Sequence, residues 1–231
     1  MHKDETAKRF TILNRIRDSL KTAYLPSARA TLPPRPFSSA RVDLSAMVET
    51  FTREVTVLKG DVHGPQPASQ AIETVITLLH GAGGNEVIAW SDEDLPLPGV
   101  FDAIRGSNFK LLDPVVPSDP AGRKAKMQQL AAASAGLTDA LGGLADTGTL
   151  VVASGPARPR FASLLPPMHI ALLPVARLYP DLPAFLAAHP DIIEVGSNVV
   201  LITGPSRSSD IEFTPTLGVH GPKTLHVVLI G

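Results

Sequence analysis

The sequence contains no cysteine among its 231 residues. This absence excludes disulfide bonds, a thiolate nucleophile, zinc–thiolate sites and cysteine-ligated iron–sulfur clusters in this chain. Its seven histidines show no H-E-x-x-H or other metal-binding spacing, and no nucleotide P-loop, flavin or nicotinamide fingerprint is present. We therefore expect no metal or cofactor in this chain, so any redox centre would belong to a partner.

The sequence also lacks an excess of charge and a long apolar run. Its 21 basic and 22 acidic residues give a net charge of −1, so no global field favours nucleic acid or an anionic membrane. No run approaches the roughly 20 apolar residues that cross a bilayer, and the charged start, Met1 to Arg17, does not resemble a signal peptide. We expect a cytoplasmic protein without a nucleic-acid partner or a membrane span.

The N-terminal segment predicts an amphipathic helix over 5–21. Its apolar residues recur at near-helical spacing among charged neighbours: Phe10, Leu13, Ile16 and Leu20. Such a stripe packs on its own domain, on a partner or on a second protomer, and the sequence leaves these alternatives open. Four prolines between Tyr24 and Phe37 then favour an extended linker. We expect residues 1–37 to form this helix and linker, and 38–231 a single α/β domain.

The body begins with two predicted helices, one from Asp43 to about Lys59 and one capped by Ser69 and ending near Gly81. Strands and helices then alternate: strands are expected at 86–90, 110–116, 135–138, 149–153, 169–173, 198–202 and 224–230, and helices at 97–105, 119–133 and 181–190. This alternation predicts an α/β fold of three layers, a mainly parallel sheet with helices on both faces, preceded by N-terminal helices.

The stretch from Asn198 to Asp210 indicates a ligand site. It combines a short buried strand, a Gly204-Pro205 turn and a predicted helix start after Ser206. Ligands bind at the carboxyl ends of parallel strands, where helix N-termini present unpaired N–H groups. We expect an anion to contact Thr203, Gly204, Ser206 and Arg207. Because an exposed ion pair contributes about 0–1 kcal/mol and micromolar binding needs roughly 8 kcal/mol, several loops must converge there.

Three further polar stretches are candidate walls of the same site. A turn before a strand offers a carboxylate and a hydroxyl, although a turn alone would also explain it. A proline-stiffened loop carries two arginines suited to a carboxylate or phosphate, although a solvated loop is equally consistent. Two histidines beside strands suit acid–base chemistry or ligand contact, with a structural role as the alternative. The candidates are Asp146 and Thr149, then Ser154, Arg158, Arg160 and His169, then His220.

Four motifs taken together resemble one family. They lie at 145–151, 163–170, 202–212 and 218–222, and in this order and spacing they are similar to the lactate-utilisation protein C family of the LUD domain. The resemblance implies a fold like the NagB, RpiA and coenzyme A transferase proteins. It also implies a role in oxidising L-lactate to pyruvate together with two iron–sulfur partner proteins. The chain departs from the family pattern at Asp146, where that pattern has glutamate.

Three functional hypotheses follow. The leading one is a cluster-free accessory or ligand-binding subunit of an L-lactate oxidation system, which takes a small carboxylate or phosphate ligand. The second is a self-sufficient enzyme on a phosphosugar or coenzyme A thioester, with Asp146, Asp210, Glu212 or His220 as catalytic candidates. The third is a pure interaction module that uses the N-terminal helix. Whether the chain is an enzyme is left open.

Overall fold

The computed structural model describes residues 2–22, 43–194, 196–209, 215–217 and 221–231. The chain divides into two compact units, 1–39 and 40–231. The first contains helix α1 (His2–Thr22), which includes the predicted amphipathic segment. Among the described residues, no helix combines the length and apolar character needed to cross a membrane.

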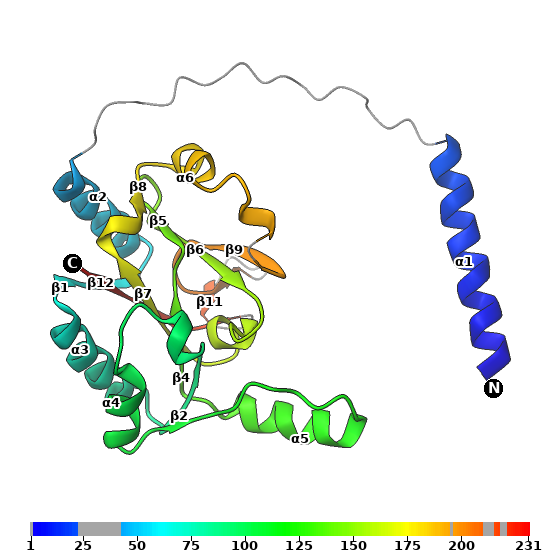
Figure 1. The fold of residues 1–231 in the computed structure, drawn as a ribbon, viewed down its shortest axis with the longest axis horizontal. Coiled ribbons are helices and arrows are strands. Elements are labelled where there is room, and N and C mark those ends of the chain that lie inside the picture. The colour runs from blue at the N-terminus through cyan, green and yellow to red at the C-terminus, as the bar shows by residue number, and fades with distance from the viewer. Residues whose placement is uncertain (1, 23–42, 195, 210–214, 218–220) are drawn as a thin grey trace. The chain divides into compact units, whose positions relative to one another are not determined.

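The second unit is built on a six-stranded parallel sheet (Figure 1). Its strands follow the order β1 (Asp61–Gln66), β12 (Thr224–Ile230), β7 (Met168–Pro174), β4 (Ala135–Asp139), β2 (Glu86–Ala89) and β3 (Lys110–Leu111). Every pair is parallel. All of β4 is buried, as expected of a central strand covered on both faces. The predicted α/β class with a mainly parallel sheet is confirmed.

The described residues of this unit form five α-helices: α2 (Leu44–Val57), α3 (Ala68–Gly81), α4 (Val100–Gly106), α5 (Pro120–Ala131) and α6 (Leu182–Ala188). Helix α3 buries Ala71, Val75 and Leu79, which are four residues apart and therefore share one face. The predicted caps of α5 and α6 are confirmed, because Asp119 accepts from the Gly122 N–H at 2.7 Å and Asp181 from the Ala184 N–H at 2.8 Å. The predicted cap at Ser69 is wrong: α3 begins before it, directly after Pro67.

A second sheet holds four strands in the order β8 (Leu178–Tyr179), β5 (Gly142–Leu144), β6 (Thr149–Ser154) and β9 (Asn198–Ile202). A separate pair joins β10 (Arg207–Ser209) to β11 (Pro215–Leu217). Four short 3₁₀ helices complete the described elements: η1 (Asp92–Asp94), η2 (Arg160–Ser163), η3 (Val175–Arg177) and η4 (Ile192–Glu194).

The predicted corner after residue 198 differs from the structure in two respects. Strand β9 runs antiparallel to β6 at the edge of the four-stranded sheet and is only partly buried, so it is not a strand of the parallel sheet. The predicted helix after Ser206 is a strand, because residues 207–209 pair with 215–217 in an antiparallel ladder. That ladder supplies hydrogen bonds that a helix would otherwise make, so the described residues of this corner include no helix N-terminus.

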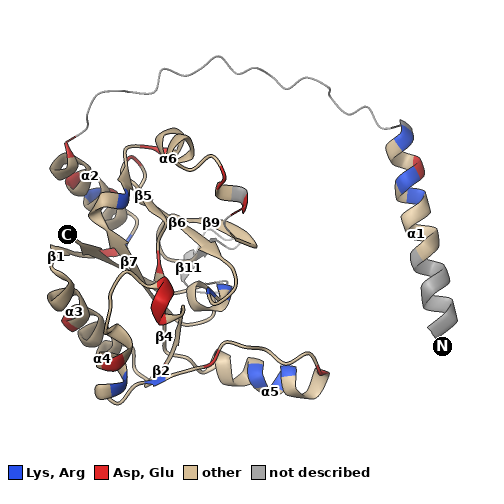
Figure 2. Cartoon of the chain, in the orientation of Figure 1, with Lys and Arg blue, Asp and Glu red and all other residues tan. Residues whose placement is uncertain are grey.

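Besides β10 and β11, three described strands escaped prediction. Strand β1 contains Gly64 and Pro65, which normally break secondary structure. It lies at the edge of the sheet, where the missing N–H of proline is tolerated. Strands β5 and β8 are only three and two residues long, too short for a recognisable periodicity. Charged residues are interspersed along the described elements (Figure 2), in keeping with the balanced composition.

Candidate functional site

A cavity of about 210 Å³ is lined by residues of the predicted corner, from Val200 to Ser206. We call it the hydroxyl cavity. Its polar lining side chains are Ser163, His169, Thr203 and Ser206. His169 and Leu225 are the second residues of β7 and β12 and are paired in register. The cavity therefore lies at the amino ends of two parallel strands. This corrects the expectation of a site at the carboxyl ends.

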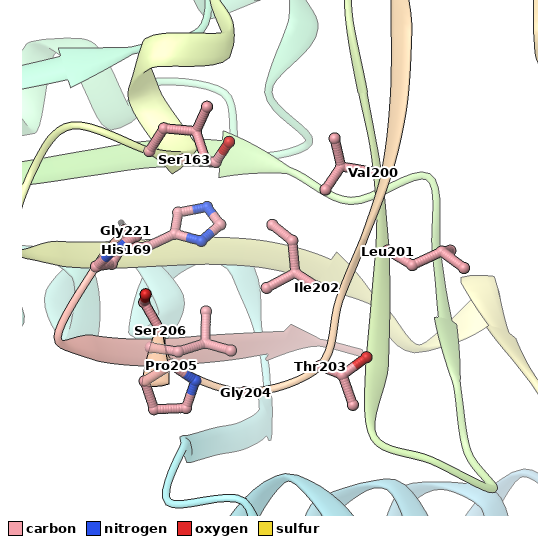
Figure 3. A pocket seen from close by; sticks show the side chains of 13 residues that line it. Ser163, His169, Val200, Leu201, Ile202, Thr203, Gly204, Pro205, Ser206 and Gly221 are labelled. Atoms are coloured by element: carbon pink, nitrogen blue, oxygen red, sulfur yellow. The ribbon is translucent and has the colours of Figure 1, made fainter. Parts of the chain in front are cut away.

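His169 is the most buried polar group of this cavity, with 1% of its surface exposed. Its Nε2 lies 2.9 Å from the hydroxyl of Thr138, which is fully buried on β4. Burial lowers the pKa of His169 to about 4, because a buried imidazolium would lose its hydration. The ring is therefore neutral at physiological pH. In Figure 3 it lies between Ser163 on one side and Ser206 on the other.

The other wall of the cavity comes from the end of β9 and the turn that follows it. Gly204 has a φ of +84°, a conformation that side chains disfavour, so glycine is required there. The Ser206 N–H donates to the Pro222 carbonyl at 2.9 Å, which ties the turn to the segment before β12. Ile202 faces the His169 ring in Figure 3, whereas Leu201 points away from it.

A row of hydroxyls leads away from Thr203. Its Oγ1 lies 2.9 Å from that of Thr149, which lies 2.8 Å from that of Thr147, and the latter donates to Asp146 at 3.1 Å. The predicted residues Asp146 and Thr149 are thus connected to the cavity wall by hydrogen bonds. Asp146 itself is exposed and does not line the cavity.

The remaining predicted site residues have different positions. Ser154 is buried, and its carbonyl accepts from Ser197 at 2.8 Å. Arg160 is exposed at the start of η2, and neither residue lines the cavity. Arg207 belongs to β10, of which the structure describes the backbone. The candidates Asp210, Glu212 and His220 lie outside the described residues.

Two polar pairs lie at the carboxyl ends of the parallel strands, and Arg158 is the one member of them that the sequence predicted as a site residue. Asp139, the last residue of β4, accepts from Arg177 Nη1 at 2.6 Å. Burial nevertheless raises its pKa to about 6, because the loss of hydration outweighs the attraction of Arg177. Arg158 lies 3.9 Å from Asp94 of η1. The position of Asp139 directly after the predicted strand 135–138 was the signal that could have identified it.

Trp90 is a further feature at these carboxyl ends that the sequence did not predict. It follows β2, is 1% exposed, and has the Arg158 guanidinium 5.9 Å from its ring centre. Trp90 and Ser91 line a larger cavity of about 400 Å³, which we call the tryptophan cavity. Within the part of the chain that the structure describes, no three His, Asp or Glu side chains are grouped to hold a metal ion.

Comparisons with known proteins agree with this architecture. The model of the LUD domain matches residues 48–230. Lactate utilization protein C from Halalkalibacterium halodurans is 28% identical over 227 residues, which cover 93% of this chain and 94% of that protein. An uncharacterized protein of Neisseria meningitidis is 39% identical over 98 residues, 42% of either chain. The crystal structure of a DUF162 family protein from Deinococcus radiodurans matches with a TM-score of 0.58 at 18% identity, covering 82% of this chain and 99% of that one, which supports the fold.

Proposed function

The chain belongs to the LUD domain family, and we propose that it is a cytoplasmic, cluster-free subunit of a system that oxidises L-lactate to pyruvate. In this proposal it binds a small carboxylate in the hydroxyl cavity, and its partners are iron–sulfur proteins that accept the electrons. The name of the Halalkalibacterium halodurans relative supports the metabolic setting. One observation carries the binding role: polar side chains from η2, β7 and the turn after β9 converge on a single small cavity.

The cavity suits a 2-hydroxy acid in its distribution of polar and apolar groups. The Ser206 hydroxyl can donate to a carboxylate, and neutral His169 offers the ring nitrogen that Thr138 does not engage. The Ser163 hydroxyl donates to the Arg160 carbonyl at 3.2 Å and would turn from it to bind a ligand. Ile202, Pro205 and Leu225 provide an apolar wall for a methyl group. The described lining residues include no cationic side chain, so neutral hydrogen bonds must hold the anion.

Energetics set the expected affinity. A neutral hydrogen bond contributes about 1 kcal/mol, and the three from Ser163, Ser206 and His169 give about 3 kcal/mol, which corresponds to a Kd of about 6 mM. Such binding suits a metabolite present at high concentration. It also agrees with a subunit that holds its ligand for a partner rather than one that captures a scarce substrate.

The binding role is tested by titrating L-lactate into the purified chain and measuring heat or chemical shifts. We expect saturation near the millimolar range, with Ser206→Ala and Ser163→Ala each weakening binding about fivefold through loss of one hydrogen bond. Ser69→Ala, an exposed serine of α3 outside the cavity, is the matched control and should bind as the parent does. Equal affinity in all four proteins would exclude this cavity.

The assembly role is tested by recovering a tagged chain from cells grown on L-lactate. Because the chain has no cysteine, visible cluster absorbance in the recovered material must come from a partner. We expect such absorbance together with stoichiometric partner proteins, and slow growth on lactate when the gene is deleted. Unimpaired lactate oxidation in the deletion strain would refute the proposal.

A further inference from the structure

The order of the parallel strands creates a crevice away from the hydroxyl cavity. Strands β2 and β4 are neighbours in the sheet. The next strand of this sheet after β2 is β3, which lies on the far side of β2 from β4, whereas the next one after β4 is β7, which lies on the far side of β4 from β2. In parallel sheets, ligands bind outside the carboxyl ends at such a reversal, because the two connections diverge there. Trp90 follows β2 at this point, and Asp139 ends β4.

Two buried polar atoms at this reversal have no hydrogen-bond partner among the residues that the structure describes: Trp90 Nε1 and Asp139 Oδ1. A buried indole N–H without an acceptor is costly, because it has exchanged water for an apolar environment. Trp90 is 1% exposed and lines the tryptophan cavity. Its N–H is therefore an unpaired donor on a residue of the cavity wall, and a ligand bound there would have to bring the acceptor.

The rest of this cavity is mainly apolar. Phe101 of α4, Leu111 at the end of β3 and the segment after it, Leu112 to Val115, form most of the wall. Its acidic lining residue, Asp113, lies 3.9 Å from Lys126, which offsets its charge. Ala157, also in the wall, has a φ of +58°, and such strained residues cluster at functional sites. The cavity of about 400 Å³ has room for a ring larger than a lactate molecule.

One cation completes the cavity. Arg105 of α4 lines it and has its guanidinium 5.5 Å from the centre of the Phe101 ring. Its nearest ion-pair partner is Asp102 at 3.7 Å, and both side chains are largely exposed, so this pair is weak and its guanidinium can turn to an incoming anion. A ring held against Phe101 would place an anionic substituent beside it.

We propose that the tryptophan cavity binds a planar ring ligand that carries a carbonyl-type acceptor and an anionic substituent. The acceptor receives the Trp90 Nε1–H, the ring packs against Phe101 and the apolar side chains Leu111 and Val115, and the anion pairs with Arg105. This site is separate from the hydroxyl cavity, and the proposal does not depend on lactate binding there.

The test exploits the fact that Trp90 is the only tryptophan of the chain, so the indole N–H gives a single resonance in an isotope-labelled sample. Anthraquinone-2-sulfonate is the probe, because it is planar, has carbonyl oxygens and is anionic. We expect a saturable shift of the indole resonance. Naphthalene-2-sulfonate, which lacks the carbonyl, should bind about tenfold more weakly, since the donor then stays unpaired.

Variants separate the three contacts. Arg105→Ala should weaken probe binding about fivefold through loss of a charge-assisted contact, whereas Arg123→Ala, an exposed arginine of α5 outside the cavity, should leave it unchanged. Trp90→Phe, followed by calorimetry, should abolish the preference for the carbonyl-bearing probe. An indole resonance that does not move at millimolar probe, or a titration identical in the Arg105→Ala protein, would overturn the proposal. Ser206→Ala should alter lactate binding alone, so the two proposals fail separately.

Discussion

At the scale of single residues, two buried titratable groups change the stability of the fold with pH in opposite directions. His169 has its pKa lowered from 6.5 to about 4, and Asp139 has its pKa raised from 3.8 to about 6, both through burial. Between pH 4 and 6.5, His169 binds a proton in the unfolded state but not in the folded state, so its contribution to the free energy of unfolding rises as pH rises. Over nearly the same interval, Asp139 binds a proton in the folded state but not in the unfolded state, so its contribution falls as pH rises.

Variants reveal these opposing contributions. Relative to the parent, the free energy of unfolding of Asp139→Asn should rise between pH 4 and pH 6, and that of His169→Gln should fall between pH 4 and pH 6.5. Each change should reach about 3 kcal/mol at most, at about 1.4 kcal/mol per pKa unit. Urea unfolding at several pH values measures both differences. Curves parallel to the parent for both variants would mean that neither group titrates in the folded protein as its burial requires.

At the scale of elements, the contact between η2 and β4 shapes the hydroxyl cavity. A Cβ at Gly136 would overlap the backbone carbonyl of Ala162 in η2, and the next residue, Ser163, lines the cavity. We expect Gly136→Ala to destabilise the chain by about 3 kcal/mol or more, because backbone must move, and to weaken lactate binding. Gly81→Ala, with no atom near the added methyl, should be neutral or stabilising by up to about 1 kcal/mol. Thermal and urea unfolding compare the two.

The sequence predicts some of these elements correctly and misses others. Helices α2, α5 and α6 and the parallel strands β2, β4, β7 and β12 follow from local periodicity and caps, and the structure confirms them. The pairing of 207–209 with 215–217 and of β9 with β6 depends on distant partners, which local patterns do not encode. His169, Thr203, Gly204 and Ser206 were predicted as one site and share a cavity. Trp90 was missed because its significance lies in the strand order.

At the scale of the whole molecule, the two cavities lie at opposite ends of one parallel sheet. The hydroxyl cavity includes His169 and Leu225 near the starts of β7 and β12, and the tryptophan cavity includes Ala89 and Leu111 at the ends of β2 and β3. Buried strands β4 and β7 lie between them in a continuous apolar core. A rigid core separating two sites allows each to be altered without rebuilding the other.

The division into two units leads to the last prediction. Within its own unit, α1 presents an uncovered apolar stripe of Phe10, Leu13, Ile16 and Leu20. If that stripe serves a partner rather than the body, a chain of residues 40–231 should keep the melting temperature of the full chain within about 2 °C, the lower end of the shift expected for 1 kcal/mol in a domain of this size. It should also fail to recover the iron–sulfur partners, while α1 with Leu13→Ala and Ile16→Ala in the full chain reproduces that loss. Circular dichroism melts measure the first effect and tagged recovery the second. A melting temperature lower by about 5 °C or more would instead indicate that α1 packs on the body, because only lost native contacts could produce such a change.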